Sequence, residues 1–513
     1  MFYYILLPII AVILATYLVL RYTVFKNSEK YTKVINITLK VCVVIYCCLM
    51  LFNVLMPDAF ELSLSQTDLA NETVRHGYVI VRWFAMVNFV TLPIAVFYKN
   101  RTIRNIAIYF GVIMTFCQLG FYSEYLKDFT SSSGRGFNSI AIMPEGAKQF
   151  FINPTFRSVW FGFILALQLL VPLVLAINEK HYFNVCDKKE YLKFFITLPC
   201  VIISSLPIYI PQHLFGGYSN LMFTPWSWVH ICWLILAIGE LIALYFIFRK
   251  RDTETKMVLL FVMSLSLLMQ YLQMFSAISI NAARLPIQLC NIGAFLILLS
   301  LMTKNKKIFN FTVIINVVGA IFALAMPDLD GEGLFYLYNM HFIFEHTNVL
   351  LVPILALLFG IFPRLDKYAL RDCIIGFSIY FVAVWTLGTT FNSVYVVTEN
   401  EFWKNVNYLF MFKVELDFTQ PLFDINFKIG TATFYPVIQL LIYVIFVLVC
   451  VLLYFAMRLI YKIKDKIMSK KSIPSYQTPS GQIEENISKD VASNDGENNR
   501  DEDDEDDQNV GSY

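Results

Sequence analysis

The sequence predicts an all-α protein, a polytopic transmembrane helical bundle of about 13 spans, built as two six-helix parallel repeats plus a final helix. Composition is the first reason. Of the 513 residues, 58% are apolar and only 15% are charged, and the mean hydropathy is +0.60. These values exclude a soluble globular protein, and no stretch between the apolar runs is long enough to bury a core of its own. Charge alternation and an internal repeat are the other two reasons.

The apolar runs give the expected positions of the helices. About 20 apolar residues cross a hydrocarbon core of about 30 Å. Runs of this length predict spans at 2–21, 34–56, 78–98, 104–122, 156–177, 192–211, 226–248, 256–277, 285–303, 308–326, 340–362, 370–390 and 433–458. The first run lacks a basic start and a small-residue cleavage site, so we expect it to stay in the protein as a helix and not to be cleaved as a signal peptide.

The connections between these runs alternate in charge. Every second connection is basic, with Lys26, Lys30 and Lys33; Lys99, Arg101 and Arg104; Lys180, Lys188 and Lys189; Arg249, Lys250 and Arg251; Lys304, Lys306 and Lys307; Arg364, Lys367 and Arg371; and Lys462, Lys464 and Lys466. The others are acidic or long and mixed. By the positive-inside rule, we expect a multi-pass plasma-membrane protein with its N-terminus outside and its C-terminus in the cytoplasm.

The end of the chain has a different composition. From Ile473 onward, 12 acidic residues stand against Lys489 and Arg500, so this segment carries 2 − 12 = −10. It has no apolar periodicity, and we expect a disordered cytoplasmic tail. The predicted domains are therefore a degenerate six-helix repeat at 1–225, a membrane domain with a candidate site at 226–460, and a basic juxtamembrane segment with the acidic tail at 461–513.

Two pairs of segments indicate an internal duplication. Residues 97–105 (FYKNRTIRN) align without gaps with residues 302–310 (MTKNKKIFN) at an offset of 205, each as a basic turn between two helices. Residues 169–172 and 350–353 both have the sequence LLVP, each within the fifth helix of its half. An even number of crossings preserves orientation, so the predicted repeats are parallel.

Several functional classes are excluded by the motifs that the sequence lacks. It has no phosphate-binding glycine loop, no HExxH, no zinc-type cysteine cluster and no nucleic-acid signature, so we expect no metal, no cofactor and no nucleic-acid partner. The ten cysteines fall mostly inside apolar runs without CxxC pairs, which makes each one a small buried hydrophobe by default.

One cysteine and one histidine form the candidate catalytic pair. Cys290 and His346 each lie about six residues into an expected helix that runs inward from the outer boundary, so both side chains are expected about 9 Å below it. An imidazole that takes the proton of a thiol allows acyl transfer through a thioester. Pro286 is expected near the start of the helix, which would place Cys290 at the positive end of the helix dipole. The positions that match the pair in the first repeat are Ala85 and Leu165, which hold neither group.

Other polar residues near this level are candidates for supporting roles. Asn291 could donate to an oxyanion, and His341 and Glu345, four residues apart, are expected to share a helix face. Glu240 lies deeper, about 21 Å into its span, and is expected to be a separate site. An acidic group at a helix centre needs a partner, and Gln270 or Gln273 on the next helix are the expected ones.

The second half of the chain resembles a known family. The segment 284–292 (RLPIQLCNI), Pro327-Asp328, His346 before Leu351-Val352-Pro353, and 407–410 (NYLF) are similar to the YwaF and transmembrane-protein-164 family of integral membrane proteins. The resemblance covers residues 226–458. The animal branch of this family is associated with the transfer of fatty acyl groups onto lysophospholipids through a Cys and a His. It therefore implies that Cys290 and His346 are catalytic, with Asp328 and Asn407 as supporting residues.

Two positions depart from the pattern expected of the family, since Gln288 stands where many relatives are expected to have His and Val414 where they are expected to have Pro. The leading hypothesis is a membrane acyltransferase or transacylase that acts on phospholipids or lysophospholipids near the outer leaflet. The alternatives are a multi-pass transporter that uses the intramembrane Glu240, and a non-catalytic membrane scaffold.

Overall fold

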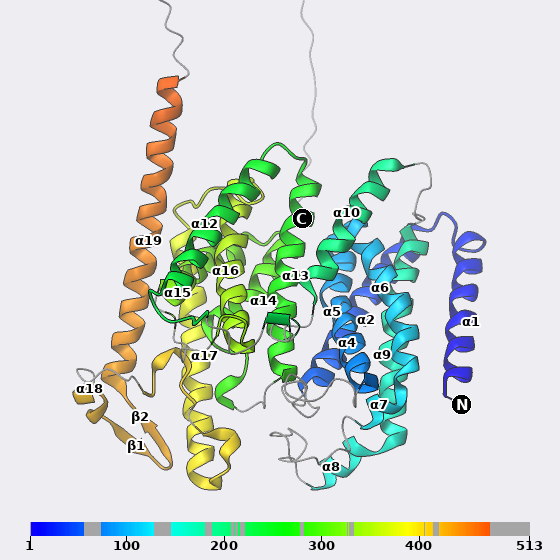
Figure 1. Ribbon diagram of the computed structural model, residues 1–513, viewed down its shortest axis with the longest axis horizontal. Coiled ribbons are helices and arrows are strands. Elements are labelled where there is room, and N and C mark those ends of the chain that lie inside the picture. The colour runs from blue at the N-terminus through cyan, green and yellow to red at the C-terminus, as the bar shows by residue number, and fades with distance from the viewer. Residues whose placement is uncertain are drawn as a thin grey trace, which may run out of the picture. The chain divides into compact units, whose positions relative to one another are not determined.

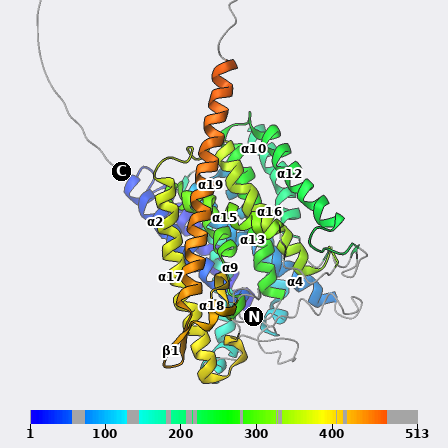
Figure 2. The same ribbon diagram turned by 90° about the vertical axis from the view of Figure 1, so that its left-hand side faces the viewer.

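The protein is a bundle of long helices (Figures 1 and 2). The computed structural model describes residues 2–55, 73–127, 145–179, 187–206, 210, 214–215, 221–277, 282–325, 327, 333–404, 406–413 and 420–471. The chain divides into two compact units, Met1–Ile460 and Tyr461–Tyr513. The predicted acidic tail lies outside the described residues.

The named elements of the first half, within the residues that the structure describes, are all helices. In chain order they are α1 (Phe2–Tyr22), α2 (Glu29–Leu55), α4 (Thr73–Ala85), α5 (Val87–Pro93), the π-helix η1 (Ile94–Tyr98), α6 (Arg101–Gly120), α7 (Tyr122–Lys127), α8 (Glu145–Ile152), α9 (Pro154–Glu179) and α10 (Lys188–Ser204).

The second half contains longer helices and one small hairpin. Its elements are α12 (Trp228–Phe248), α13 (Thr253–Ala277), η2 (Ala282–Arg284), α14 (Leu289–Thr303), α15 (Lys306–Ala325), α16 (Leu337–Leu358), α17 (Ala369–Thr398), η3 (Glu401–Trp403), η4 (Tyr408–Phe410), α18 (Gln420–Asp424), β1 (Phe427–Ile429), β2 (Ala432–Phe434) and α19 (Pro436–Lys471). The all-α prediction therefore holds apart from the antiparallel β1–β2 pair, in which Phe427 faces Phe434.

Eleven of the described helical segments are long and apolar enough to cross a membrane. Each of the 13 expected spans coincides with a helix, but two are short. The expected span 192–211 is α10, which has 17 residues and carries charges in its first turns, and the span 285–303 is α14, which has only 15. A helix of 15 residues is about 22 Å long, less than the thickness of the hydrocarbon core.

Two further expectations about the spans need correction. The span 78–98 is not one continuous helix: it is interrupted at Met86 between α4 and α5, and it continues beyond Pro93 as the π-helix η1. Proline removes one backbone donor, and a wider helical turn accommodates the loss. The span 370–390 is longer than expected, because α17 continues through the start of the predicted loop to Thr398. Helix α17 also contacts β2 (Figure 1).

The two halves pair their helices in the same way when α4, α5 and η1 are counted as one span. In the first half, α9 contacts α1, α2 and α6, and α6 also contacts α5 and α10. In the second half, α16 contacts α12, α13 and α15, and α15 also contacts α14 and α17. Counted from the start of each half, the fifth helix thus packs on the first, second and fourth, and the fourth packs on the third and sixth.

The basic turns of the two halves have the same backbone. Lys99 and Lys304 both end a helix in the left-handed region, with φ of 60° and 55°. The next residues, Asn100 and Asn305, accept a hydrogen bond from the N–H three residues further on, at 2.9 Å and 3.2 Å. This is the N-cap geometry that starts α6 and α15.

A buried amide follows each turn and reaches the sixth helix of its half. Asn105 donates to the Glu190 carboxylate on α10 at 2.8 Å, and Asn310 donates to the Asp372 carboxylate on α17 at 3.0 Å. Both asparagines are almost fully buried. The two hydrogen bonds join the fourth and sixth helices near the basic turns.

A glycine and an asparagine meet where the third and fourth helices cross in each half. In the first half, Asn88 lies on the third helix against Gly111 on the fourth, with 3.3 Å between Asn88 Nδ2 and the position of an added Cβ. In the second half, Gly293 lies on the third helix against Asn316 on the fourth, where the same distance is 2.1 Å. Both pairs are related by the offset of 205, with the two residue types exchanged.

Candidate functional site

Cys290 lies at the start of α14. The helix begins at Leu289, because Gln288 is extended at the N-cap and the first helical hydrogen bond runs from Ile292 N to Gln288 O at 3.0 Å. Pro286 lies outside the helix, so Cys290 is its second residue and not about its sixth. The backbone N–H groups of Cys290 and Asn291 have no acceptor within the helix and lie within hydrogen-bond range of the Cys290 sulfur. These amides can stabilise negative charge at that sulfur.

Helix α16 supplies an acid and two imidazoles. His341 Nε2 donates to Glu345 Oε2 at 3.1 Å, which confirms the expected shared helix face. His346 Nδ1 donates to the Phe342 carbonyl oxygen at 2.8 Å. Because a carboxylate and a carbonyl only accept, the neutral rings keep an acceptor nitrogen, Nδ1 in His341 and Nε2 in His346. All three side chains are buried.

Two of these groups carry polar atoms without partners. Within the described part of the chain, His341 Nδ1 and Glu345 Oε1 are both buried and form no hydrogen bond. A buried polar atom left unsatisfied costs about 1–3 kcal/mol. Such atoms are typical of sites that bind a ligand, and here they come from residues predicted only for supporting roles.

The partly buried Cys290 and the buried acid–imidazole pair belong to the same cluster. The Cys290 thiol interacts electrostatically with Glu345. Tyr271, on α13, interacts with both groups, and its ring lies 5.7 Å from the His341 ring. Asn291, whose Oδ1 lies 3.6 Å from the Cys290 sulfur, also interacts with the Tyr271 side chain. The residues Cys290, Asn291, His341, Glu345 and Tyr271 form what we call the thiol cluster.

Two more tyrosines cover the start of α14, and neither was predicted. Tyr380, on α17, donates to the Ile287 carbonyl at 2.8 Å and interacts electrostatically with Cys290. Tyr408, in η4, donates to the Ala282 carbonyl, and burial raises the pKa of its phenol. Only the family-like segment 407–410 pointed to this region, since tyrosines in apolar runs carry no signal of their own.

The pairing of Cys290 with His346 stays a prediction. Cys290 Sγ contacts Asn291 Oδ1 at 3.6 Å, and no hydrogen bond within the described residues joins it to His346. His346 is the tenth residue of α16 and Cys290 the second of α14, so the expectation that each lies about six residues into its helix was wrong. Their equal depth stays a prediction. Helix α14 starts four residues later than the expected 285, and α16 starts three residues earlier than the expected 340.

The remaining predicted residues have other roles or lie elsewhere. Asn407 organises its own loop, since its Oδ1 accepts from Phe412 N and Lys413 N at 3.0 Å and 3.1 Å. Asp328 lies outside the described residues. Gln288, at the position where His was expected, accepts from Leu409 N at 3.4 Å and so connects the loop with the start of α14.

Glu240 does not lie inside the bundle. It is exposed on α12, whose fully buried residues Val229, His230 and Ala237 all lie in its first ten positions. The second part of the helix is covered on one side only, where Tyr245 stacks on Phe359. The expected hydrogen bond to Gln270 is absent, and Gln270 Oε1 is itself without a partner among the described residues. The side chain of Gln273 is not among those that the structure describes.

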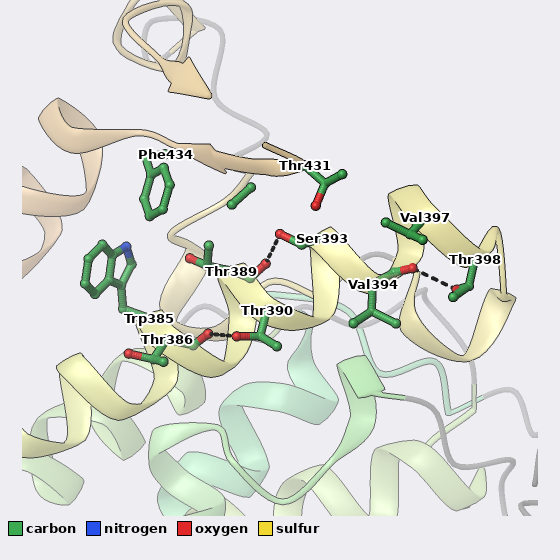
Figure 3. Close-up of a pocket in the computed structure, with 11 residues that line it drawn as sticks. Trp385, Thr386, Thr389, Thr390, Ser393, Val394, Val397, Thr398, Thr431 and Phe434 are labelled. Carbon is green, nitrogen blue, oxygen red and sulfur yellow. Dashed lines mark hydrogen bonds between the residues drawn. The ribbon is translucent and has the colours of Figure 1, made fainter. Parts of the chain in front are cut away.

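In the described part of the second half, pockets lie on two sides of α17. The first, of about 510 Å³, lies between α17 and the β hairpin (Figure 3). Thr390 and Ser393 turn their hydroxyls back to carbonyls one turn earlier, so these polar groups are already satisfied. The second pocket, of about 870 Å³, lies between α14, α15 and α17 and reaches Ile292 and Tyr380, which border the thiol cluster.

Residues 218–454, which include the start of α14 and the histidines of α16, match the TMEM164 family profile. Residues 218–454 are a TMEM164 family domain. The resemblance inferred from the sequence over 226–458 is thereby confirmed for this segment, and the chain is a multi-pass membrane protein with a TMEM164 family domain in its second half. No curated protein and no solved structure matches the chain.

The described part of the TMEM164 family domain holds no group of three or more His, Cys, Asp or Glu side chains that could bind a metal ion.

Proposed function

We propose that this protein is a membrane-embedded phospholipid transacylase with Cys290 as its nucleophile. The observation that carries the proposal is the position of a thiol at a helix N-terminus beside the buried Glu345–His341 pair. Within the described residues, Glu345 Oε1 and His341 Nδ1 of this pair form no hydrogen bond. Backbone N–H groups beside the sulfur supply donors for a thiolate or an oxyanion, and an oriented imidazole supplies a base.

The reaction needs no co-reactant beyond two lipids. The Cys290 sulfur attacks the ester carbonyl of a phospholipid while the imidazole takes the thiol proton. The C–O bond breaks, the acyl group stays on sulfur as a thioester, and the released lysophospholipid oxygen receives the proton. A hydroxyl of a second lysophospholipid then attacks the thioester, the C–S bond breaks, and the thiol is restored.

Helix α16 offers two imidazoles for the proton transfer. The sequence and the family resemblance assign this role to His346, whose Nε2 is an acceptor. His341 is the alternative favoured by the contacts, because Glu345 orients it and its free Nδ1 belongs to the thiol cluster. In both cases Glu345 fixes the charge and orientation of the site, and Asn291, through its side-chain NH₂, is the proposed donor to an oxyanion.

The test is acyl exchange with purified protein in mixed micelles that contain a radiolabelled phospholipid and an unlabelled lysophospholipid. The wild type should transfer label and should trap a hydroxylamine-sensitive acyl group after an acid quench. Cys290→Ala should do neither, while Cys232→Ala, an exposed cysteine on α12, serves as the control. Label transfer by Cys290→Ala would contradict the thioester route.

We also propose that the two halves arose by duplication, as parallel repeats. The equal helix pairing, the left-handed lysine turns and the exchanged Asn–Gly crossing support this. On that basis the first half is a repeat without the thiol cluster, because Ala85 and Leu165 replace Cys290 and His346. The proposed orientation, with the N-terminus outside a plasma membrane, continues to rest on the charge alternation of the loops.

A further inference from the structure

The groove between α14, α15 and α17 is polar at one end and apolar along the rest. Lys307, at the start of α15, and Arg371 and Asp372, at the start of α17, line its polar end. Its walls are apolar, formed by Ile292, Leu296, Ile308, Phe311, Ile375 and Ile379. Ile375 and Ile379 are about half exposed or more, so the groove is open at the side where lipid would surround the helices.

The charge at the polar end is positive overall. Arg371 donates one hydrogen bond to Asp372 Oδ1 at 3.1 Å, and Asp372 also accepts from Asn310 at 3.0 Å, so this carboxylate is already bonded on both oxygens. Lys307 is exposed and has no ion pair within the described residues. Two cations and one carboxylate leave a charge of +1, which a monoanionic phosphodiester would neutralise.

The length of the groove matches one leaflet. From Arg371 to Ala383, the lining residues of α17 span 12 helical positions, which is about 18 Å. Half of a hydrocarbon core of about 30 Å is about 15 Å. The exposed ring of Tyr368 under the Arg371 guanidinium, 5.0 Å away, is typical of the membrane–water interface.

Gly376, which has no side chain, lines the groove opposite Phe311. A Cβ added to Gly376 would lie 2.8 Å from Cδ2 of Phe311, so the glycine allows the Phe311 ring to pack closely against α17. The far end of the groove is formed by Tyr380, whose hydroxyl bonds to Ile287 near Cys290. An acyl chain in the groove would therefore end against the tyrosine that covers the thiol cluster.

We propose that this groove binds one anionic phospholipid from the leaflet on the basic side of the protein. Its phosphate contacts Lys307 and Arg371, and one acyl chain lies along α17 between Ile375 and Ala383. This lipid is not the acyl donor, because its ester groups lie at the basic end of the groove and only its chain terminus approaches Tyr380. The proposal is independent of the transacylase proposal.

The test is native mass spectrometry of the full-length protein in detergent, with phosphatidylglycerol or phosphatidylcholine added at equal concentration. Phosphatidylglycerol should bind several-fold better. The double variant Lys307→Gln/Arg371→Gln should lose about tenfold in phosphatidylglycerol affinity, since two charged hydrogen-bond donors to phosphate are removed. The control Lys250→Gln/Arg251→Gln removes the same charge from another basic connection and should bind like the wild type.

A second pair of variants tests the acyl chain. Ala383→Trp fills the apolar end of the groove and should weaken phosphatidylglycerol binding, whereas Ala243→Trp, at an exposed position of α12, should not. Equal binding of the two lipids, or equal loss in both charge variants, would overturn the proposal. Displacement of the bound lipid by glycerol 3-phosphate with no effect of Ala383→Trp would show an anion site only. A dimer that excludes lipid would show that a second copy fills the groove.

Discussion

The two halves of the protein differ at their polar centres although their helices pair alike. In the first half, Gln168 is fully buried and saturated, since Nε2 donates to Thr115 Oγ1 and Gln118 Oε1 at 3.2 Å each and Oε1 accepts from Tyr46 at 3.4 Å. In the second half, the polar centre is the thiol cluster, where His341 Nδ1 and Glu345 Oε1 have no partner in the described region.

The crossing of the third and fourth helices shows the same difference at the level of one residue. Asn88 is satisfied, because its Nδ2 donates to the Ala107 carbonyl at 3.2 Å and its Oδ1 accepts from Thr91 at 2.9 Å. Asn316, at the exchanged position, leaves both its Oδ1 and its Nδ2 without a partner. A closed hydrogen-bond network stabilises a core, whereas an open one keeps polar atoms available to a ligand.

The largest expected effect concerns the general base of the thiol cluster in the second half. Replacing the catalytic imidazole should reduce acyl exchange by about 10²- to 10⁴-fold, as is typical when a general base is lost. The rates of label transfer of His346→Ala and His341→Ala, each compared with the Gln variant at the same position, show which imidazole acts as the general base. If neither substitution changes the rate of label transfer, α16 does not supply the base and the thiol cluster is not a catalytic site.

The next largest effect tests the crossing of the third and fourth helices, at which the Gly and Asn positions are exchanged between the two halves. Gly293→Asn should overpack the crossing against Asn316 and destabilise the protein by about 1–3 kcal/mol. The double variant Gly293→Asn/Asn316→Gly recreates the first-half arrangement and should recover most of the loss, measured as the thermal midpoint in detergent. Gly319→Ala is the control, because an added Cβ there meets nothing within 4 Å. No recovery in the double variant would argue against equivalent crossings in the two halves.

A smaller effect is expected at Glu240, outside both polar centres. Because Glu240 is exposed on α12 and has no described hydrogen bond, Glu240→Gln should leave both the folded yield and acyl exchange near wild type. A transporter that uses this carboxylate would behave differently. Loss of function in Glu240→Gln together with normal lipid profiles in cells that express Cys290→Ala would favour the transporter hypothesis.

The smallest effect comes from an ion pair at the basic end of the second half. A hydrogen bond from Lys306 lowers the pKa of Asp366. Its folded pKa therefore lies below the unfolded value of about 3.9, and its stabilisation is present above that value and lost as the pH falls through the folded pKa. Both side chains are more than a third exposed, so the effect should be below about 1 kcal/mol. Asp366→Asn should thus lower the thermal midpoint slightly at pH 7 and not at all at strongly acidic pH.

The sequence by itself determined the membrane class, the positions of the helices and the family of residues 218–454. Apolar runs of about 20 residues are long enough to cross the hydrocarbon core. Because backbone polar groups must be hydrogen bonded within such a segment, it forms a helix, and these conclusions need no tertiary contacts. The basic turns were also predictable, because the segments 97–105 and 302–310 share a local motif that forms an N-cap through nearby atoms.

Tertiary structure alone decided which polar groups share a site. Tyr271, Cys290 and Glu345 come from three helices, and their approach depends on how α13, α14 and α16 pack, which apolar periodicity does not encode. The sequence predicted that Cys290 lies about six residues into its helix, and this count failed because Pro286 and the turn after it delay the start of α14 to Leu289. Glu240 was expected inside for a similar reason: a sequence shows that a charge lies in a span, but only packing decides which face of the helix is covered.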